Sequence, residues 1–134
     1  MTIDEIKQFF ANDKYAELSG VVIEHVEAGK ATGYMDVTER HLNAGGACQG
    51  GAIFTLADTL IAVAVNSTGI GNVSVQASIS FTAAGRPGSR LTCKAEVSVP
   101  HKKLPSVIAT VTDNDGRIVA TATALCYNKA ADKK

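Results

Sequence analysis

The run of residues 52–65 constrains the fold of this chain more than any other segment. Its composition favours a helix, and it is apolar around almost the whole helical circumference, a pattern that predicts a helix buried on every side. In a chain of 134 residues, enough for one hydrophobic core, such a helix has to lie at the centre of that core. Asp58 lies in the middle of the run, with no Lys or Arg within a helical turn or two.

An ionised carboxylate inside an apolar helix is costly unless a partner pairs with it, and burial therefore raises its pKa. Raised pKa values are concentrated at functional sites, which makes Asp58 a candidate catalytic group. The alternative is a structural aspartate that hydrogen-bonds the backbone of another strand. The residue alone does not separate these two interpretations.

Composition and charge exclude several classes of protein. Hydrophobic residues make up 46% of the chain and charged residues 19%, which is typical of a globular protein. Lys plus Arg equals Asp plus Glu at 13 each, so no basic surplus exists that would bind nucleic acid or an anionic membrane. The N-terminus lacks the pattern of a signal peptide, and the run 52–65 is too short to span a bilayer. We therefore expect a cytoplasmic protein without a membrane or nucleic-acid partner.

The three cysteines, Cys48, Cys93 and Cys126, are too few and too scattered for a disulfide framework or a zinc site. We therefore expect neither a metal nor another cofactor. Cys48 is an alternative nucleophile because thiolates are stabilised near helix N-termini, although no adjacent histidine completes a Cys–His pair.

The remaining segments alternate between helical and strand patterns. A helical spacing of apolar residues covers 2–12, and a glycine-rich loop over 43–51 leads into the run 52–65. Alternating or short apolar runs between turn residues predict strands at 21–26, 31–37, 73–81, 91–99, 107–112 and 118–127. The tail from 128 is polar, and we expect it to be frayed.

Strands that are joined by short turns pair antiparallel, and only the run 52–65 is apolar enough to fill the concave face of such a sheet. The predicted fold is therefore α+β, with a curved antiparallel β-sheet wrapped around one long central helix. We expect residues 1–134 to form a single domain.

The residues around the central helix form a recognisable pattern: His41-Leu42-Asn43, Gly50-Gly51, Phe54 to Asp58, and Asn66-Ser67. The pattern resembles the signature of hotdog-fold thioesterases of the phenylacetic-acid-degradation (PaaI-like) subfamily, and the resemblance covers nearly the whole chain. It implies a hotdog fold and an acyl-CoA thioesterase that hydrolyses an aryl-, arylacetyl- or medium-chain acyl-CoA thioester. Coenzyme A would then be part of the substrate and not a cofactor.

The resemblance also implies roles for individual residues. Asp58 corresponds to the nucleophile or general base, and the N–H of Gly50 to the donor that polarises the thioester carbonyl. Asn43 corresponds to a loop asparagine that holds the nucleophilic water or the carbonyl, and Ser74 to a hydroxyl that orients water. Gln49 stands where the family usually has His, so we expect no histidine-dependent step at this position.

Like Asp58, the other residues also have a simpler structural interpretation. Gly50 and Gly51 would fit a turn that needs a positive φ or close packing. Asn43 would close an Asx-turn, Gln49 would cap the helix backbone, and Ser74 would be an ordinary strand residue. The sequence leaves these alternatives open.

The spacing of the two main candidates predicts an oligomer. Gly50 and Asp58 are eight residues apart, which corresponds to roughly 12 Å along one helix. One thioester carbonyl cannot contact both within hydrogen-bond distance, so the two must come from different chains if they act on one substrate. This predicts a homodimer with two shared active sites. The resemblance implies the same, with sheets joined edge to edge and two dimers often packed as a homotetramer.

Gly51 and Thr59, beside the candidate catalytic residues, are expected to contact the substrate. The phosphates of coenzyme A need cationic side chains, and the candidates lie in turns or at strand ends: Arg86 and Lys102, with Arg90 and Lys103 beside them. Two rival functions stay open. A non-hydrolytic acyl-CoA binding or sensing protein would hold Asp58 in a fixed structural contact, and a hotdog dehydratase would need a histidine at the helix start.

Overall fold

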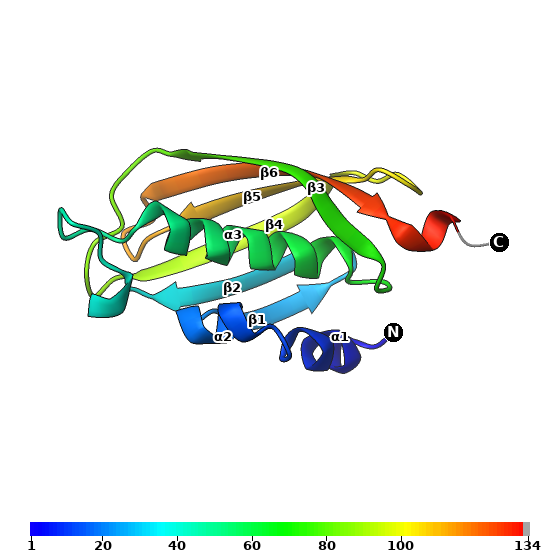
Figure 1. The fold of residues 1–134 in the computed structure, drawn as a ribbon, viewed down its shortest axis with the longest axis horizontal. Helices are drawn as coiled ribbons and strands as arrows, with labels where there is room; N and C mark the ends of the chain where they lie inside the picture. The colour runs from blue at the N-terminus through cyan, green and yellow to red at the C-terminus, as the bar shows by residue number, and fades with distance from the viewer. Residues whose placement is uncertain (133–134) are drawn as a thin grey trace.

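A computed structural model describes residues 1–132 of the chain (Figure 1). Two short helices come first, followed by two strands, the long helix and the remaining strands. Their bounds are α1 (Ile3–Phe10), α2 (Lys14–Ser19), β1 (Val22–Glu27), β2 (Lys30–Asp36), α3 (Gly50–Val65), β3 (Asn72–Phe81), β4 (Arg90–Val99), β5 (Ser106–Thr112) and β6 (Ile118–Asn128). Short 3-10 helices cover Glu39–His41 and Lys129–Asp132.

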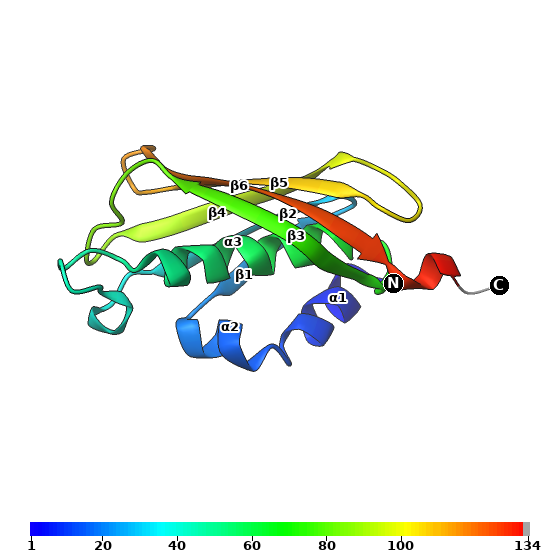
Figure 2. The ribbon, with the colours of Figure 1, turned by 45° about the horizontal axis from the view of Figure 1, so that its top comes forward.

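Within residues 1–132 the strands form one six-stranded sheet in the order β1-β2-β4-β5-β6-β3, and every neighbouring pair is antiparallel. The sheet curves, and α3 lies along its concave face (Figure 2). Gly29 and Gly116 adopt the left-handed conformation, with φ of 76° and 78°, in the turns that join β1 to β2 and β5 to β6. The predicted hotdog fold is confirmed.

The inner face of α3 is the centre of the hydrophobic core. Leu56, Leu60 and Val63 on this face have no exposed surface. The sheet contributes alternate residues of its strands, which are equally buried: Met35, Leu91, Cys93, Val107, Val111 and Val119. Gly33 on β2 allows close approach, because a Cβ at this position would lie 3.1 Å from Cδ1 of Leu60.

The two edges of the sheet differ. Beside β1 lie α1 and α2, and Nζ of Lys7 donates to the carbonyl of Glu24 at 3.3 Å, so this edge is partly covered. The outer side of β3 pairs with no strand among residues 1–132. It exposes Val73, Val75 and Phe81 by 42%, 56% and 51%. A long open edge with exposed apolar side chains is suited to pairing with another chain.

Two segments differ from the prediction. The helix predicted over 2–12 ends earlier and is followed by α2, which has Asp13 as its N-cap and Gly20 as its C-cap with a φ of 81°. The tail expected to be frayed instead forms a 3-10 turn over Lys129–Asp132, and residues 133–134 lie outside the described part. In the described part of the chain, no helix is long and apolar enough to cross a membrane.

Candidate active site

One stripe of α3 faces away from the core and is open to solvent. It consists of Gly51, Thr55, Asp58 and Ala62, which are spaced as one face of a helix and are exposed or partly exposed. The prediction of a helix buried on every side is therefore wrong for this stripe. The apolar composition of the whole run predicts burial, whereas this stripe remains in contact with solvent in the single chain.

Asp58 lies in the middle of the exposed stripe. Within residues 1–132 its carboxylate forms neither a hydrogen bond nor an ion pair, so the structural contact considered as its alternative role is not present there. Surrounding protein atoms remove part of its hydration, and this desolvation raises the pKa of the Asp58 carboxyl. The negative charge of Asp13 raises it further. The raised pKa predicted from the sequence is confirmed in direction.

The N-terminus of α3 offers unpaired hydrogen-bond donors. Neither the Gly50 nor the Gly51 N–H donates to any group among residues 1–132, whereas those of Ala52 and Ile53 both donate to the Gln49 carbonyl. Free N–H groups at the positive end of a helix dipole form a site for an oxyanion. The Gly50 N–H is therefore available for the predicted polarisation of a carbonyl.

Close packing explains why position 50 is a glycine. A Cβ on Gly50 would lie 2.9 Å from Cζ of Phe81, at the end of β3. Neither Gly50 nor Gly51 has a positive φ, so of the two structural interpretations packing is confirmed and positive φ is wrong. The half-exposed ring of Phe81 thus forms a wall beside the free N–H.

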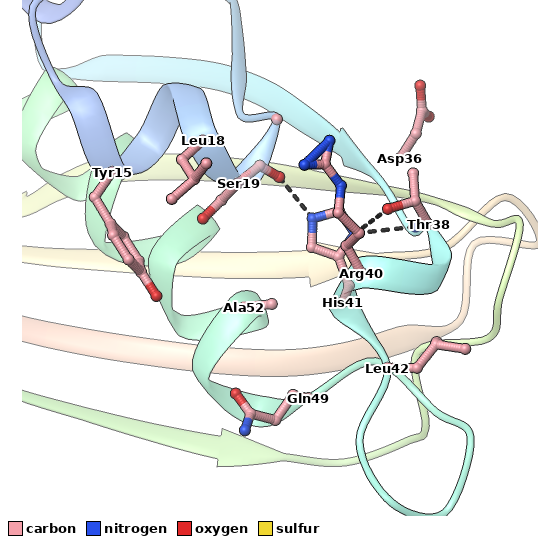
Figure 3. Close-up of a pocket in the computed structure, with 11 residues that line it drawn as sticks. Tyr15, Leu18, Ser19, Asp36, Thr38, Arg40, His41, Leu42, Gln49 and Ala52 are labelled. Atoms are coloured by element: carbon pink, nitrogen blue, oxygen red, sulfur yellow. Dashed lines mark hydrogen bonds between the residues drawn. The ribbon is translucent and has the colours of Figure 1, made fainter.

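His41 holds the root of the loop that leads into α3, as the dashed lines in Figure 3 show. Its Nδ1 accepts from the Thr38 N–H at 2.9 Å, and its Nε2 lies 2.6 Å from the Ser19 carbonyl. Because a backbone N–H only donates and a carbonyl only accepts, the ring is neutral with its proton on Nε2. The His41 carbonyl also accepts from the Gln49 N–H at 2.7 Å. His41 therefore fixes the residue that precedes Gly50.

Asn43 closes the tip of the same loop. Its Oδ1 accepts from the N–H groups of Gly45 at 2.9 Å and Ala47 at 3.1 Å, which confirms the Asx-turn interpretation. Its Nδ2 donates to no group among residues 1–132, and the residue is exposed. The loop uses the oxygen of this amide, and the nitrogen remains available.

Gln49 is the N-cap residue of α3, and its side chain is exposed. No side-chain hydrogen bond caps the helix, so the interpretation of Gln49 as a capping side chain is wrong. Its Oε1 lies 2.8 Å from the position that a Cβ on Gly51 would occupy, so Gly51 makes room for it. The residue lines a cavity of about 600 Å³ between α2, the turn at residues 38–42 and the start of α3 (Figure 3).

Two further cavities meet at Asp58. A cavity of about 290 Å³ lies toward the start of the helix and is lined by Gly51, Phe54, Thr55 and Asp58. A larger cavity, of about 480 Å³, extends toward the C-terminal end of α3 and includes Ser74 of β3. Ser74 Oγ also lies 3.8 Å from Sγ of the buried Cys126. The structure therefore brings Ser74 and Gly51 to the surroundings of Asp58.

The other predicted substrate-binding residues lie further away. Thr59 is buried, and its hydroxyl donates to the Thr55 carbonyl at 2.7 Å. The loop of Arg86 packs at the start of α3, where the neighbouring Gly85 carbonyl accepts from the Cys48 N–H. Lys102 lines a cavity at the opposite end of the helix. One subunit therefore does not bring Arg86 and Lys102 to the same phosphate.

The alternative candidates Arg90, Lys103 and Cys48 are not suited to the predicted roles in this structure. Arg90 forms a bidentate pair with Asp36, at 2.7 and 3.1 Å, and Lys103 pairs with Asp132 at 3.6 Å. Burial raises the pKa of the Cys48 thiol to about 11, which disfavours the thiolate that a nucleophile needs. Arg40, which the sequence did not single out, has no ion-pair partner among residues 1–132 and lines the cavity beside Gln49.

Comparisons with known proteins agree with this geometry. A family model described as the thioesterase superfamily matches residues 45–120, which include α3 and β3. A relative from Archaeoglobus fulgidus, whose name proposes an esterase activity, is 30% identical over 131 residues, or 97% of this chain and 85% of the relative. The acyl-coenzyme A thioesterase PaaI of Escherichia coli is 39% identical over 88 residues, which are 66% of this chain and 63% of that protein.

Solved structures extend the comparison to the whole fold. The PaaI protein from the phenylacetic acid degradation operon of Escherichia coli matches with a TM-score of 0.89 and 29% identity, over 96% of both chains. A hypothetical thioesterase of Streptococcus pneumoniae with coenzyme A matches with a TM-score of 0.84 and 28% identity, over 90% of this chain and 94% of that one. Structures of that protein with one aspartate or one threonine replaced by alanine match with TM-scores of 0.78 and 0.77.

Proposed function

The chain belongs to the thioesterase superfamily and is a PaaI-like thioester hydrolase, and from this premise we propose that it hydrolyses an acyl-CoA thioester with Asp58 of one subunit and Gly50 of another. The acyl group would be aryl, arylacetyl or medium-chain aliphatic, and the products are the free acid and coenzyme A. The observation that carries the proposal is the absence of any fixed partner for the Asp58 carboxylate within residues 1–132.

Two groups of α3 carry out different parts of the proposed reaction. The Gly50 N–H donates to the thioester oxygen and stabilises the negative charge that develops on it. The Asp58 carboxylate either removes a proton from an attacking water or attacks the carbonyl carbon itself. In the first route water adds to the carbonyl carbon and the C–S bond breaks. In the second route the C–S bond breaks as Asp58 forms a mixed anhydride with the acyl group, and water then hydrolyses the anhydride and restores the carboxylate. In both routes the sulfur leaves as the coenzyme A thiolate and gains a proton.

The two groups act across a subunit interface in this proposal. Both lie on α3, separated by roughly 12 Å along its axis, which is too far for one carbonyl to contact both. The open edge of β3 supplies a surface through which a second copy would continue the sheet. A two-fold axis at this edge generates two equivalent sites, and a further pairing of dimers would give the homotetramer expected from the resemblance.

Asn43 and Ser74 assist in the same proposal. The free Nδ2 of Asn43 is suited to donate to the carbonyl or to the attacking water. Ser74 shares the larger cavity with Asp58 and lies sixteen positions after it. The aspartate and the threonine replaced in the pneumococcal relative have the same separation, which supports a role for the Ser74 hydroxyl in holding the water.

A panel of CoA thioesters tests the proposed function. The purified protein is mixed with benzoyl-, phenylacetyl-, hexanoyl- and octanoyl-CoA, and the release of the coenzyme A thiol is followed with a thiol reagent. We expect hydrolysis of at least one thioester and its loss in Asp58→Asn, with Asp115→Asn, an exposed aspartate in the turn before β6, as the matched control. Tight binding of these thioesters without thiol release would favour the non-hydrolytic binding protein.

A further inference from the structure

The larger cavity at Asp58 has an apolar wall beyond its catalytic end. It begins at Asp58 and Ser74 and is lined further on by residues of the C-terminal end of α3 and of α1. Its apolar lining comes from α1, α3, β3 and the segment between α3 and β3: Phe9, Phe10, Ala62, Val65, Ile70 and Val73. Asn66, Asn72 and Lys129 line the same cavity with polar groups. An apolar cavity that opens beside a reactive carboxylate is suited to an apolar substituent of the reacting carbonyl.

Of the two substituents of the thioester carbonyl, only the acyl group is suited to contact these apolar side chains. The arm that carries coenzyme A bears phosphates, and moving these charges against apolar side chains would be costly. The acyl arm is the remaining substituent of the carbonyl carbon that Asp58 has to reach. An acyl chain with a second carboxylate would meet the negative charge of Asp58, which Asp13 already opposes. The apolar side chains of the cavity therefore favour an apolar acyl group.

Phe10 forms the boundary between this cavity and a second one. The second cavity, of about 530 Å³, lies among α1, α2 and β1, and Thr59 of α3 lines it. Phe10 is the aromatic residue that lines both cavities. Its ring is partly buried against the core and meets the Phe9 ring edge-on, with centroids 5.2 Å apart and an interplanar angle of 82°. These contacts hold the ring in place between the two spaces.

Resting on the proposed function, we propose that the acyl group occupies the cavity beside Asp58 and that Phe10 closes the side of this cavity that faces the second one and limits acyl length. Phe10 is then a specificity-determining residue supplied by the N-terminal helix. Shortening its side chain joins the two cavities and admits chains that the parent protein rejects. The joined space brings Thr59 into contact with the end of a long chain, although Thr59 lies apart from the substrate in the parent protein.

The test compares kcat/KM for a long and a shorter acyl chain, so that the measured quantity is their ratio. kcat/KM is determined with octanoyl-CoA and dodecanoyl-CoA for the parent protein, Phe10→Ala and the milder Phe10→Leu. The matched control is Ile3→Ala, which removes an exposed apolar side chain from the same helix outside both cavities. We expect the dodecanoyl-to-octanoyl ratio to rise about tenfold or more in Phe10→Ala and less in Phe10→Leu, because a few methylenes in an apolar pocket change discrimination by that order.

The outcomes separate this inference from the proposed function. If Phe10 only stabilised α1, its replacement would lower kcat/KM for both thioesters by the same factor and leave the ratio unchanged, which would overturn the inference while the hydrolase assignment stands. If Phe10→Ala does not fold, the ratio in Phe10→Leu decides in the same way. If the parent protein hydrolyses no CoA thioester in the panel, the proposed substrate class is wrong and this acyl site is wrong with it.

Discussion

The two faces of α3 differ in composition and in surroundings. The inner face, with Leu56, Leu60 and Val63, is fully buried against the sheet. The outer stripe, with Gly51, Asp58 and Ala62, is left open by the single chain. The inner face is therefore a surface that the chain covers itself. The outer stripe carries the Asp58 carboxylate, which has no partner among residues 1–132, and in the proposed function a second copy covers this stripe.

The residues of α3 that we expect to determine stability therefore lie on a different face from those that we expect to determine activity. Replacements on the inner face leave cavities in a closely packed core. On the outer stripe, Asp58→Asn changes a carboxylate that has no hydrogen-bond or ion-pair partner among residues 1–132. If this division is correct, substitutions on the inner face lower stability and largely retain activity, whereas substitution of Asp58 on the outer stripe lowers activity and retains stability.

Asp58→Asn has the largest expected effect. It keeps the shape of the side chain and removes the charge that drives attack, so we expect kcat/KM to fall by about 10²–10⁴. The melting temperature should not fall, because the parent carboxylate has no hydrogen-bond or ion-pair partner among residues 1–132. Steady-state kinetics and a thermal melt on the same preparation check both. Undiminished hydrolysis of every good substrate would show that the carboxylate mechanism is wrong.

Leu60→Ala examines the opposite face. Leu60 is fully buried and lies near Gly33 on β2, so its truncation should lower the free energy of unfolding by about 2–5 kcal/mol. Below its melting transition the variant should retain most of its kcat. Denaturant unfolding measures the loss, and Thr55→Ala on the outer stripe is the control, with a change within about 0.5 kcal/mol. Equal losses at the two positions would contradict the division of the helix.

Val75→Lys tests whether a second copy of the chain pairs at the open edge of β3 and covers the outer stripe. Val75 is 56% exposed on the open edge of β3, and a lysine there would oppose the same charge across a two-fold axis. We expect light scattering to show dissociation and activity per chain to fall with the fraction of monomer. Ile118→Lys, at the start of β6, where the side chain is 48% exposed, should leave the oligomer intact. A fully active monomer would disprove the shared site.

The pH dependence is the smallest and most specific effect. Desolvation raises the pKa of Asp58 above its ordinary value of 3.8, and the unfolded chain has the ordinary value. The ionised group therefore destabilises the fold above its folded pKa, and this penalty disappears as the pH falls below 3.8. Asp58→Asn should be slightly more stable than the parent at neutral pH and equally stable below pH 3.8. A variant that is less stable at neutral pH would contradict the direction of the shift.

The activity profile follows from the same ionisation. Hydrolysis should rise with pH through one step displaced above 3.8 and then level off. Gln49 adds no second step, because an amide does not exchange a proton near neutral pH. A bell-shaped profile with a limb near neutrality would point to a histidine in the reaction.

Most of the fold could be predicted because the sequence signals are local. The change from helical to alternating periodicity marks the boundary between α3 and the strands, and turn glycines such as Gly29 and Gly116 mark the hairpins. α2 was missed although Asp13 and Gly20 are suitable caps, because six residues hold too few periodic positions to indicate a helix.

The surroundings of the site could be predicted only in part. Apolar composition cannot distinguish the interior of one chain from the interface between two, which is why the outer stripe of α3 was expected to be buried. The contacts of His41 with Ser19 and of Gly50 with Phe81 join residues that are distant in the sequence. These contacts depend on how the helices and strands pack, and no local sequence pattern predicts them. Asn43, in contrast, closes its turn within a few residues, and its structural role was predictable.

The central claim is that each active site combines Asp58 and Gly50 from different chains, and mixing two inactive variants tests it directly. Gly50→Pro removes the donor N–H, and the backbone is compatible with it: Gly50 is the first helical residue, and the φ of −63° and ψ of 141° at Gln49 suit a residue before proline. The proline also adds a Cβ against Phe81. Gly50→Ala adds a Cβ against Phe81 and keeps the N–H, so it controls for the packing change.

Asp58→Asn and Gly50→Pro are each purified, mixed in equal amounts, dissociated and reassembled. In a mixed dimer, one site receives both intact groups and the other receives neither, and random assembly makes half of the dimers mixed. We therefore predict recovery of about a quarter of the parent activity from two preparations that are nearly inactive alone. If mass spectrometry confirms mixed dimers and the activity stays at the level of the separate variants, each site is built within one chain and the account is wrong.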